Sequence, residues 1–140
     1  MNEATALKET NSATAACLRV LVVDDNEASA KTMGWAMEML GHQIKLAHNG
    51  ADAIRISDEF VPQLVLLDIG LPGMNGYEIC QRLQQNPKLA KTIFVAQTGW
   101  GEEKHRESTK AAGFHHHLVK PVPLEMLEEL LTDIQPQLAS

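Results

Sequence analysis

The chain has 140 residues, a length that suits a single domain with one hydrophobic core. Its formal net charge of −6 argues against binding to the nucleic-acid phosphate backbone, and no apolar run approaches the length of a membrane span. The N-terminus lacks the basic-then-apolar order of a signal peptide, so we expect a cytoplasmic protein with no direct nucleic-acid or membrane partner. Cys17 and Cys80 are too few for a disulfide framework and are expected to fill small apolar spaces.

The first sixteen residues differ in composition from the remainder of the chain. Residues 1–16 are rich in Ala, Thr, Asn and Glu, and Leu7 is their only large aliphatic side chain beyond Met1. Such a segment buries too little apolar surface to offset the entropy of ordering it. We therefore predict a disordered N-terminal arm or linker over 1–16 and a folded domain over 17–138.

From residue 18 onward, short apolar runs alternate with segments of helical periodicity. Continuous aliphatic runs indicate strands buried on both faces, and apolar side chains three and four residues apart indicate helices. In chain order the expected elements are a strand at 20–23, a helix at 27–40, a strand at 43–47, a helix at 51–60, a strand at 62–68, a helix at 77–85, a strand at 92–97, a helix at 102–112, a strand at 114–119 and a helix from 123. In the last helix, the side chains expected to face inward are Leu124, Leu127, Leu131 and Ile134.

This order of elements predicts a flavodoxin-like (βα)5 fold. Strands joined by helical crossovers form a parallel sheet with helices on both faces and right-handed connections. With five units the expected strand order is 2-1-3-4-5, and the chain reverses direction across the sheet between strands 1 and 3. Ligands of such sheets bind at the carboxyl ends of the strands, beside that reversal point.

Polar side chains follow the apolar runs at this predicted edge. Asp24 and Asp25 follow the first run, Asp68 ends the third, Thr98 follows the fourth and Lys120 follows the fifth. Because the carboxyl ends of parallel strands share one edge, we expect these groups to lie close together. The sequence therefore predicts an acidic site that includes one hydroxyl and one ammonium group.

Three carboxylates in one place need compensating positive charge. Two unit charges about 4 Å apart repel by roughly 4 kcal/mol at an effective dielectric constant of about 20. Lys120 supplies one positive charge, and Mg²⁺, which prefers hard oxygen ligands, would supply the rest. A carboxylate can also attack phosphorus to give an acyl phosphate, with the positive charges stabilising the transferring group.

Four segments of the chain resemble the receiver domain of two-component response regulators, over about residues 18–138. Their order and spacing make the resemblance specific, although no single one is decisive. The segments are VLVVDDN (20–26), LVLLDIGLPGMNGYE (64–78), VAQTGWGEE (95–103) and AAGFHHHLVKPV (111–122). Within the family, residues 20–48 and 95–122 are most similar to receivers attached to hybrid histidine kinases.

The resemblance implies roles for the acidic residues. Asp68 matches the phosphoacceptor, which takes a phosphoryl group from a phosphohistidine donor. Asp24 and Asp25 match the acidic pair that holds Mg²⁺ together with Asp68, and the backbone carbonyl of Gly70 is expected as a further ligand.

The resemblance also implies how the phosphoryl group is sensed. Thr98 matches the switch hydroxyl that moves toward the phosphoryl group, and Lys120 matches the lysine that pairs with it. The peptide bond before Pro121 is expected to be cis. Receivers usually carry an aromatic residue three positions before the lysine, and His117 stands there in this chain. We therefore expect a modified switch at His117.

The function that these residues predict is a phosphorylation-dependent signalling switch. The donor would be a histidine kinase or a histidine phosphotransfer protein, and the surface of the fourth helix, fifth strand and fifth helix would change its binding to a partner. The domain would catalyse only its own phosphorylation and dephosphorylation, and we expect a monomer. Trp35 lies off the apolar stripe of the first helix and is expected at the surface, where it could pack beside the last helix or contact a partner.

Two other classes of function remain open from the sequence. One is a constitutive protein-interaction module in which phosphorylation plays no part. The other is a Mg²⁺-dependent phosphatase with an aspartyl nucleophile. That class normally has a second acid two residues after the nucleophile, where this chain has Gly70.

Overall fold

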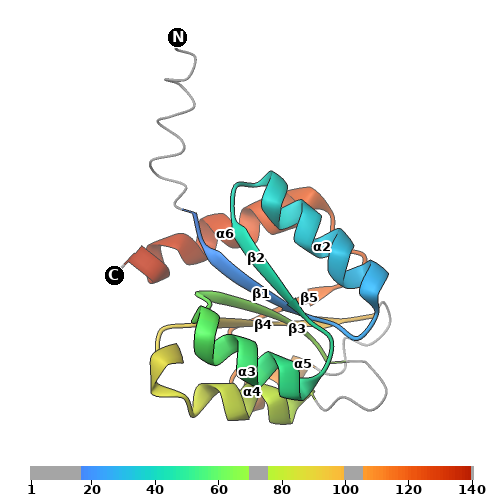
Figure 1. The fold of residues 1–140 in the computed structure, drawn as a ribbon. Helices are drawn as coiled ribbons and strands as arrows, with labels where there is room; N and C mark the ends of the chain where they lie inside the picture. The colour runs from blue at the N-terminus through green and yellow to red at the C-terminus, as the bar shows by residue number, and fades with distance from the viewer. Residues whose placement is uncertain (1–16, 70–75, 100–105, 140) are drawn as a thin grey trace.

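A computed structural model describes residues 17–69, 76–99 and 106–139 of the chain. Five parallel strands form one sheet in the order β2-β1-β3-β4-β5 (Figure 1). The strands are β1 (Arg19–Val23), β2 (Gln43–Ala47), β3 (Leu64–Asp68), β4 (Ile93–Thr98) and β5 (His116–Val119). The predicted fold class and strand order are confirmed, whereas the segment expected as an arm, 1–16, lies outside the described residues.

Helices cover both faces of the sheet. The α-helices are α2 (Glu27–Met39), α3 (Gly50–Phe60), α4 (Gly76–Gln84), α5 (Arg106–Ala112) and α6 (Leu124–Ala139), and a short 3-10 helix, η1, spans Pro87–Leu89. Helices α2 and α6 lie on one face, and α3, α4 and α5 lie on the other (Figure 1). Within the described ranges, no helix is both long and apolar enough to cross a membrane.

The alternation of side chains along the strands divides the apolar interior into two cores. In β1, Val20 and Val22 face α2 and α6, and Leu21 and Val23 face the other three helices. The α2–α6 core also contains Met37, Leu66, Val95, Leu118, Leu127, Leu130, Leu131 and Ile134. The α3–α4–α5 core contains Ala53, Val65, Leu67, Ile79, Cys80, Leu83, Phe94, Ala96 and Phe114. Both faces of the central strands are thus buried, as continuous aliphatic runs predict.

Asparagine caps start two helices directly after the strands that precede them. The Oδ1 atom of Asn26 accepts the backbone N–H of Ser29 at 2.9 Å at the start of α2. The Oδ1 atom of Asn49 accepts the backbone N–H of Asp52 at 2.8 Å at the start of α3. Each cap satisfies a donor that the first helical turn leaves unpaired, so both helices begin at the edge of the sheet where the strands end.

Strand β5 begins two residues later than expected, at His116 rather than Phe114. The reason is a side chain that replaces a backbone acceptor. The backbone N–H of Phe94 donates to the Nδ1 atom of His115 at 3.0 Å, and the N–H of His115 donates to the Phe94 carbonyl at 2.7 Å. The regular pairing of β4 with β5 therefore starts only at Val95 and His116.

Other expectations differ from the structure at the ends of elements and at single side chains. Strand β3 begins at Leu64 rather than residue 62, and the part of the expected helix at 102–105 lies outside the described residues. Leu124 was expected to face inward but is 40% exposed, because it occupies the first position of α6, and Leu130 is buried instead. Trp35 is 62% exposed, as its position off the apolar stripe predicts.

The two cysteines lie in different environments. Cys80 is buried within the α3–α4–α5 core, and this burial raises the pKa of its thiol to about 12. Cys17 is exposed, so the expectation that it fills an apolar space is wrong. It precedes β1 and lies outside the packed layers.

A buried histidine makes the stability of the fold sensitive to acid. The Nδ1 atom of His42 accepts the backbone N–H of Leu18 at 3.0 Å, and burial lowers the pKa of His42. The unfolded chain therefore binds a proton more readily than the folded chain, so this stability is complete above the ordinary histidine pKa of about 6.5 and falls as the pH drops below it. We expect His42→Asn, whose Oδ1 can accept the same N–H, to flatten this pH dependence. Thermal unfolding between about pH 7 and 5 measures it, and equal slopes for the two proteins would contradict the assignment.

Candidate functional site

Four of the predicted site residues lie at the carboxyl edge of the sheet. Asp24 follows β1, Asp68 ends β3, Thr98 ends β4 and Lys120 follows β5. Parallel pairing fixes their relative heights, because Asp68 is the register partner of Gln97 and the residue before Lys120 is the partner of Thr98. The sheet therefore gathers groups that are far apart in the sequence at one edge.

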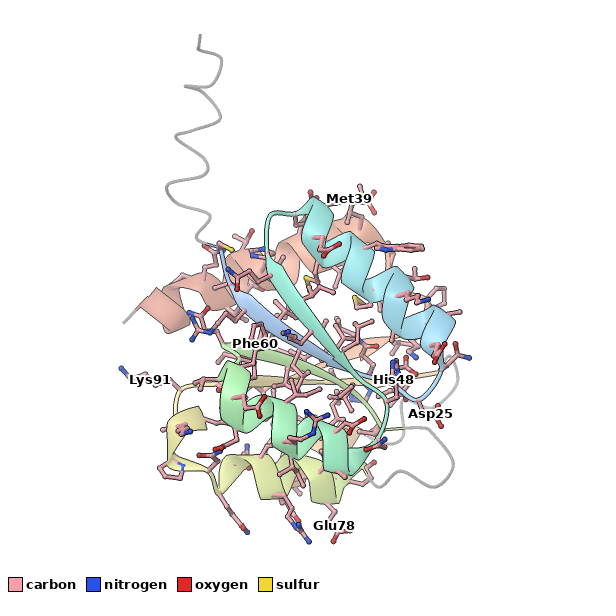
Figure 2. All side chains as sticks on the ribbon, viewed as in Figure 1. Asp25, Met39, His48, Phe60, Glu78 and Lys91 are labelled. Atoms are coloured by element: carbon pink, nitrogen blue, oxygen red, sulfur yellow. The ribbon has the colours of Figure 1, made fainter. Side chains whose placement is uncertain are left out.

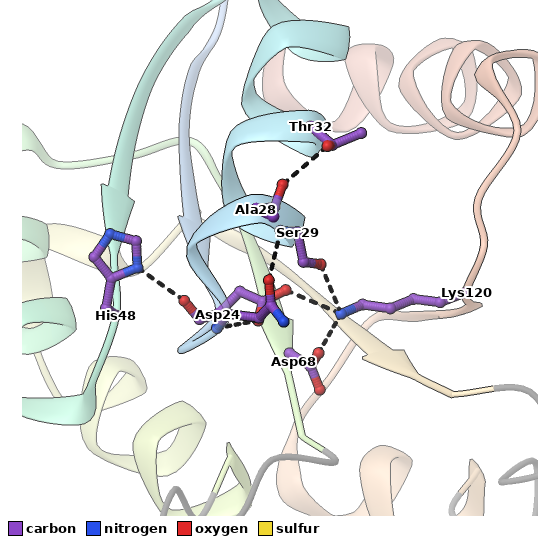
Figure 3. Close-up of polar contacts among 8 residues, drawn as sticks. Asp24, Ala28, Ser29, Thr32, His48, Asp68 and Lys120 are labelled. Atoms are coloured by element: carbon purple, nitrogen blue, oxygen red, sulfur yellow. Dashed lines mark hydrogen bonds and ion pairs between the residues drawn. The ribbon is translucent and has the colours of Figure 1, made fainter.

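Lys120 connects two of the carboxylates directly. Its Nζ atom lies 2.9 Å from the Oδ2 atom of Asp24, hydrogen-bonds to the Oδ2 atom of Asp68 and lies 3.1 Å from the Oγ atom of Ser29 (Figure 3). The side chains of Asp24 and Asp68 are only 2% and 6% exposed, and that of Lys120 is 27% exposed. Burial lowers the pKa of Lys120, but hydrogen bonds to Asp68 and Asp24 outweigh burial, so the net shift raises it. The ammonium group therefore stays protonated at neutral pH.

The backbone around Asp24 fixes the direction of its carboxylate. The Oδ1 atom of Asp24 accepts the backbone N–H of Asn26 at 3.0 Å, which leaves Oδ2 for Lys120. The N–H of Asp24 donates to the carbonyl of Ala47 at 3.0 Å, and its carbonyl lies 3.0 Å from the Nδ1 atom of His48 (Figure 3). Asp24 thus extends the pairing of β1 with β2 while its side chain points into the site.

Asp25 lies at the same edge but differs from Asp24 in exposure. Figure 2 places Asp25 and His48 at one end of the molecule and Lys91, which precedes β4, at the other. Asp25 is exposed, because its side chain points away from the buried side chain of the preceding Asp24. The structure therefore brings Asp24 and Asp68 into contact with Lys120 and leaves Asp25 beside them at the surface.

The oxygen donors of this site fit a magnesium ion. Two buried carboxylates, those of Asp24 and Asp68, face the ammonium group of Lys120, so these three groups together carry a net charge of −1 when all are ionised. Mg²⁺ commonly takes one or two protein carboxylates and completes its shell with water and phosphate oxygens. In the described part of the chain no group of three His, Cys, Asp or Glu side chains is placed to hold a metal. The expected ligand Gly70 lies outside the described residues.

Thr98 contacts His117. Its hydroxyl lies 2.8 Å from the Nε2 atom of His117, whose Nδ1 atom lies 3.2 Å from the hydroxyl of Thr109 in α5. Thr98 follows Gln97, the register partner of Asp68, so its side chain leaves the sheet on the opposite face from Gln97. The peptide bond between Lys120 and Pro121 is cis.

Sequence reasoning missed three side chains that lie at this edge or contact its residues. Ser29 lies three residues after the cap Asn26, and that cap spacing beside an acidic pair could have pointed to it. Thr109 gave no signal, because its contact with His117 joins two different elements. Gln97 gave a signal that was not used, since a glutamine inside an otherwise apolar run is unusual. It is 2% exposed, and within the described residues its Nε2 atom has no hydrogen-bond partner.

Comparison with known proteins assigns the chain to one family. The Response regulator receiver domain family matches residues 20–132. The chain is 30% identical to the signal transduction histidine-protein kinase BarA of Escherichia coli K12 over 119 residues, and this aligned region covers 85% of the chain and 13% of the kinase. It is 32% identical over 115 residues to the sensor histidine kinase RcsC of the same strain, covering 82% of this chain and 12% of the kinase. The chain thus spans a small part of the length of these kinases.

Solved structures agree with this assignment. The chemotaxis protein CheY4 of Vibrio cholerae has a TM-score of 0.78 at 23% identity, over 85% of this chain and 99% of that one, and shows the shared fold. A CheY-like receiver domain from Methylobacillus flagellatus has a TM-score of 0.76 at 28% identity, over 85% and 99% of the two chains. The fold is that of a flavodoxin-like signalling domain. The chain belongs to the response regulator receiver domain family of two-component systems, and its relatives include the receiver domains of hybrid histidine kinases.

Removing Lys120 is expected to destabilise the fold at neutral pH. Lys120→Met leaves two buried carboxylates facing each other, and we expect a loss of about 3 kcal/mol, the low end for removing one partner of a buried ion pair. Magnesium chloride should return part of this loss, because the cation takes over the compensating charge. Lys88→Met is the matched control, since Lys88 pairs with Asp58 at 3.3 Å on the exposed surface. Denaturant unfolding measures both, and similar effects of the two variants would contradict this account.

Replacing Gln97 is expected to stabilise the fold. Gln97→Met keeps the volume of the side chain and removes a buried amide donor that lacks a partner among the described residues. We expect a gain of about 1 kcal/mol in the free energy of unfolding. Gln84→Met is the control, because the Nε2 atom of Gln84 donates to the carbonyl of Gly113 at 2.8 Å and that bond would be lost. A loss of stability in Gln97→Met would show that the amide has a partner in solution.

Proposed function

We propose that this domain is a phosphorelay receiver that accepts a phosphoryl group on Asp68 from a phosphohistidine. The observation that carries the proposal is the contact of one ammonium group, that of Lys120, with the two buried carboxylates Asp24 and Asp68. Buried carboxylates that share one cation at the reversal point of a parallel sheet are suited to bind an anionic phosphoryl group with a divalent ion. Membership of the receiver family supports the same reading.

The proposed reaction is a transfer between two nucleophiles. A carboxylate oxygen of Asp68 attacks phosphorus, the new oxygen–phosphorus bond forms, and the phosphorus–nitrogen bond of the donor breaks, so that the imidazole leaves and takes a proton from solvent. Lys120 stabilises negative charge on the transferring group through its ammonium. Bound Mg²⁺, held by Asp24, Asp25, Asp68 and the carbonyl of Gly70, would supply further positive charge at the phosphoryl oxygens. Thr98 would donate a hydrogen bond to one of these oxygens.

The proposed partners follow from this chemistry. The donor is a histidine kinase or a histidine phosphotransfer protein, and the names of BarA and RcsC describe histidine kinases. The output surface is formed by α5, β5 and α6; β5 pairs with β4 as far as Thr98 and ends directly before Lys120. The domain acts in the cytoplasm as a monomer and turns over only its own phosphoryl group.

A small acyl phosphate tests the phosphoacceptor. With acetyl phosphate and Mg²⁺, we expect the intact mass of the wild-type chain to increase by one phosphoryl group, because Asp68 can attack the donor without a kinase. Asp68→Asn should gain nothing, and a chelator should suppress the gain in the wild type. Labelling of Asp68→Asn to the wild-type level, or no labelling of either protein, would contradict the proposal.

The same material separates the other classes of function. Turnover of a chromogenic phosphate monoester would indicate a phosphatase that acts on external substrates. Equal affinity of a partner for wild type and Asp68→Ala, measured under phosphorylating conditions, would indicate a constitutive interaction module. The receiver assignment expects no turnover and unequal affinities.

A further inference from the structure

His117 bridges two buried hydroxyl groups that belong to different elements. Its Nε2 atom lies 2.8 Å from the hydroxyl of Thr98 at the end of β4, and its Nδ1 atom lies 3.2 Å from the hydroxyl of Thr109 in α5. Thr98 and Thr109 are 0% and 2% exposed. One ring therefore connects the edge of the sheet that carries the site to the middle of a covering helix.

The sheet register explains why the ring reaches both groups. His117 is the register partner of Ala96, and Thr98 follows Ala96 by two positions, so all three side chains share one face of the sheet. That face is the one covered by α5, and Ala96 belongs to the α3–α4–α5 core. His117 thus reaches Thr98 across the strands and Thr109 across the layers.

Thr98, His117 and Thr109 form a row of two hydrogen bonds, and the donors and acceptors in this row can be arranged in two directions. A threonine hydroxyl has one proton, and in a neutral imidazole one nitrogen donates while the other accepts. In the first direction Thr98 donates to Nε2, and Nδ1–H donates to Thr109. In the second direction Thr109 donates to Nδ1, and Nε2–H donates to Thr98. Only the second direction leaves the proton of Thr98 free for a third group.

We propose that His117 is a positioning residue that sets the direction of this row, and that phosphorylation of the site selects the second direction. This inference rests on the proposed phosphorylation of Asp68, in which Thr98 donates its proton to a phosphoryl oxygen. The hydroxyl of Thr98 must then accept from Nε2–H, so Nδ1 accepts from Thr109. One proton leaves Nδ1 and one reaches Nε2 by exchange with water, and the charge of the ring does not change.

The consequence is a signal that reaches α5 without rotation of a side chain out of the core. When the direction reverses, the hydroxyl of Thr109 changes from acceptor to donor toward His117. Helix α5 has only seven residues, Arg106–Ala112, and Thr109 is its central one. A ring made only of carbon, such as phenylalanine, would fill the same space but could not carry this change. The histidine thus determines how a change at Thr98 is transmitted to α5.

Two-dimensional NMR of isotope-labelled imidazole nitrogens tests the proposal in the wild-type chain. Beryllofluoride with Mg²⁺ serves as the phosphoryl mimic, and signals of His117 are assigned by their absence from His117→Phe. Near pH 8, above the ordinary histidine pKa of about 6.5, a neutral ring reports its tautomer. We expect the proton to move to Nε2 when the mimic is added. The same tautomer in both states, or an unprotonated Nε2 in the loaded state, would overturn the proposal.

Two substitutions at Thr109 provide an independent readout. Thr109→Val removes the hydroxyl at constant shape, and in the loaded state it leaves Nδ1 without the proton that Thr109 donates. We therefore expect the nitrogen signal of Nδ1 in the loaded state to shift downfield in Thr109→Val, because an unprotonated nitrogen that accepts a hydrogen bond is more shielded than one that does not, and Thr109→Ser should restore the wild-type position. An unchanged Nδ1 signal in Thr109→Val would overturn the proposal. If Thr109→Val does not fold, the tautomer measurement on the wild type decides.

Acetyl phosphate labelling separates this inference from the function on which it rests. If wild type is not phosphorylated at all, the proposed function has failed. If wild type is phosphorylated on Asp68 while the tautomer of His117 stays fixed, only the relay through His117 has failed.

Discussion

The ion cluster formed by Lys120, Asp24 and Asp68 is the constraint on which the rest of the site depends. Its contacts join residues 96 and 52 positions apart in the sequence and thereby tie the ends of β1, β3 and β5 together. Such a cluster adds little to stability by itself, because taking charges out of water offsets most of their attraction. Its main effect is instead to fix the relative positions of the strand ends. Loss of either kind of charge leaves the other buried without compensation, so the cluster holds three strand ends in one arrangement.

A second polar network occupies the opposite face of the same edge. Gln97 and Thr98 are consecutive in β4, and alternation sends their side chains to different faces. Gln97 lies beside Asp68 in register, whereas Thr98 contacts His117 and through it Thr109. At this edge of the sheet, the charged groups of the ion cluster therefore lie on one face, and the neutral hydroxyls with the imidazole of His117 lie on the other. The first set would bind the phosphoryl group, and the second would respond to it. A phosphoryl group attached to Asp68 would lie at the strand ends, within reach of both networks.

Much of this arrangement was predictable because it depends on strand ends. Apolar runs fixed the five strands, and parallel connection then placed Asp24, Asp68, Thr98 and Lys120 at one edge without any knowledge of side-chain contacts. Sequence could not show which side chain of the Asp24–Asp25 pair points inward, because that depends on where β1 stops pairing. Nor could it show the partner of His117, since Thr109 lies on a helix whose rotation is set by packing. The late start of β5 has the same origin, because there the ring of His115 replaces a backbone acceptor.

Charge arithmetic links the proposed metal to the proposed modification. Asp24 and Asp68 against Lys120 leave a charge of about −1 in the buried cluster, counting one unit per ionised group. A phosphoryl group brings about −2 at neutral pH and masks the charge of Asp68, so the cluster would reach about −2. Each added negative charge raises the affinity for a divalent cation, and by reciprocity the cation favours the phosphorylated state. Lys120 alone offsets most of the negative charge of the resting site, but not that of the phosphorylated one. The neighbouring Asp25 is exposed, so its carboxylate could bind an incoming cation without disturbing the buried ion cluster.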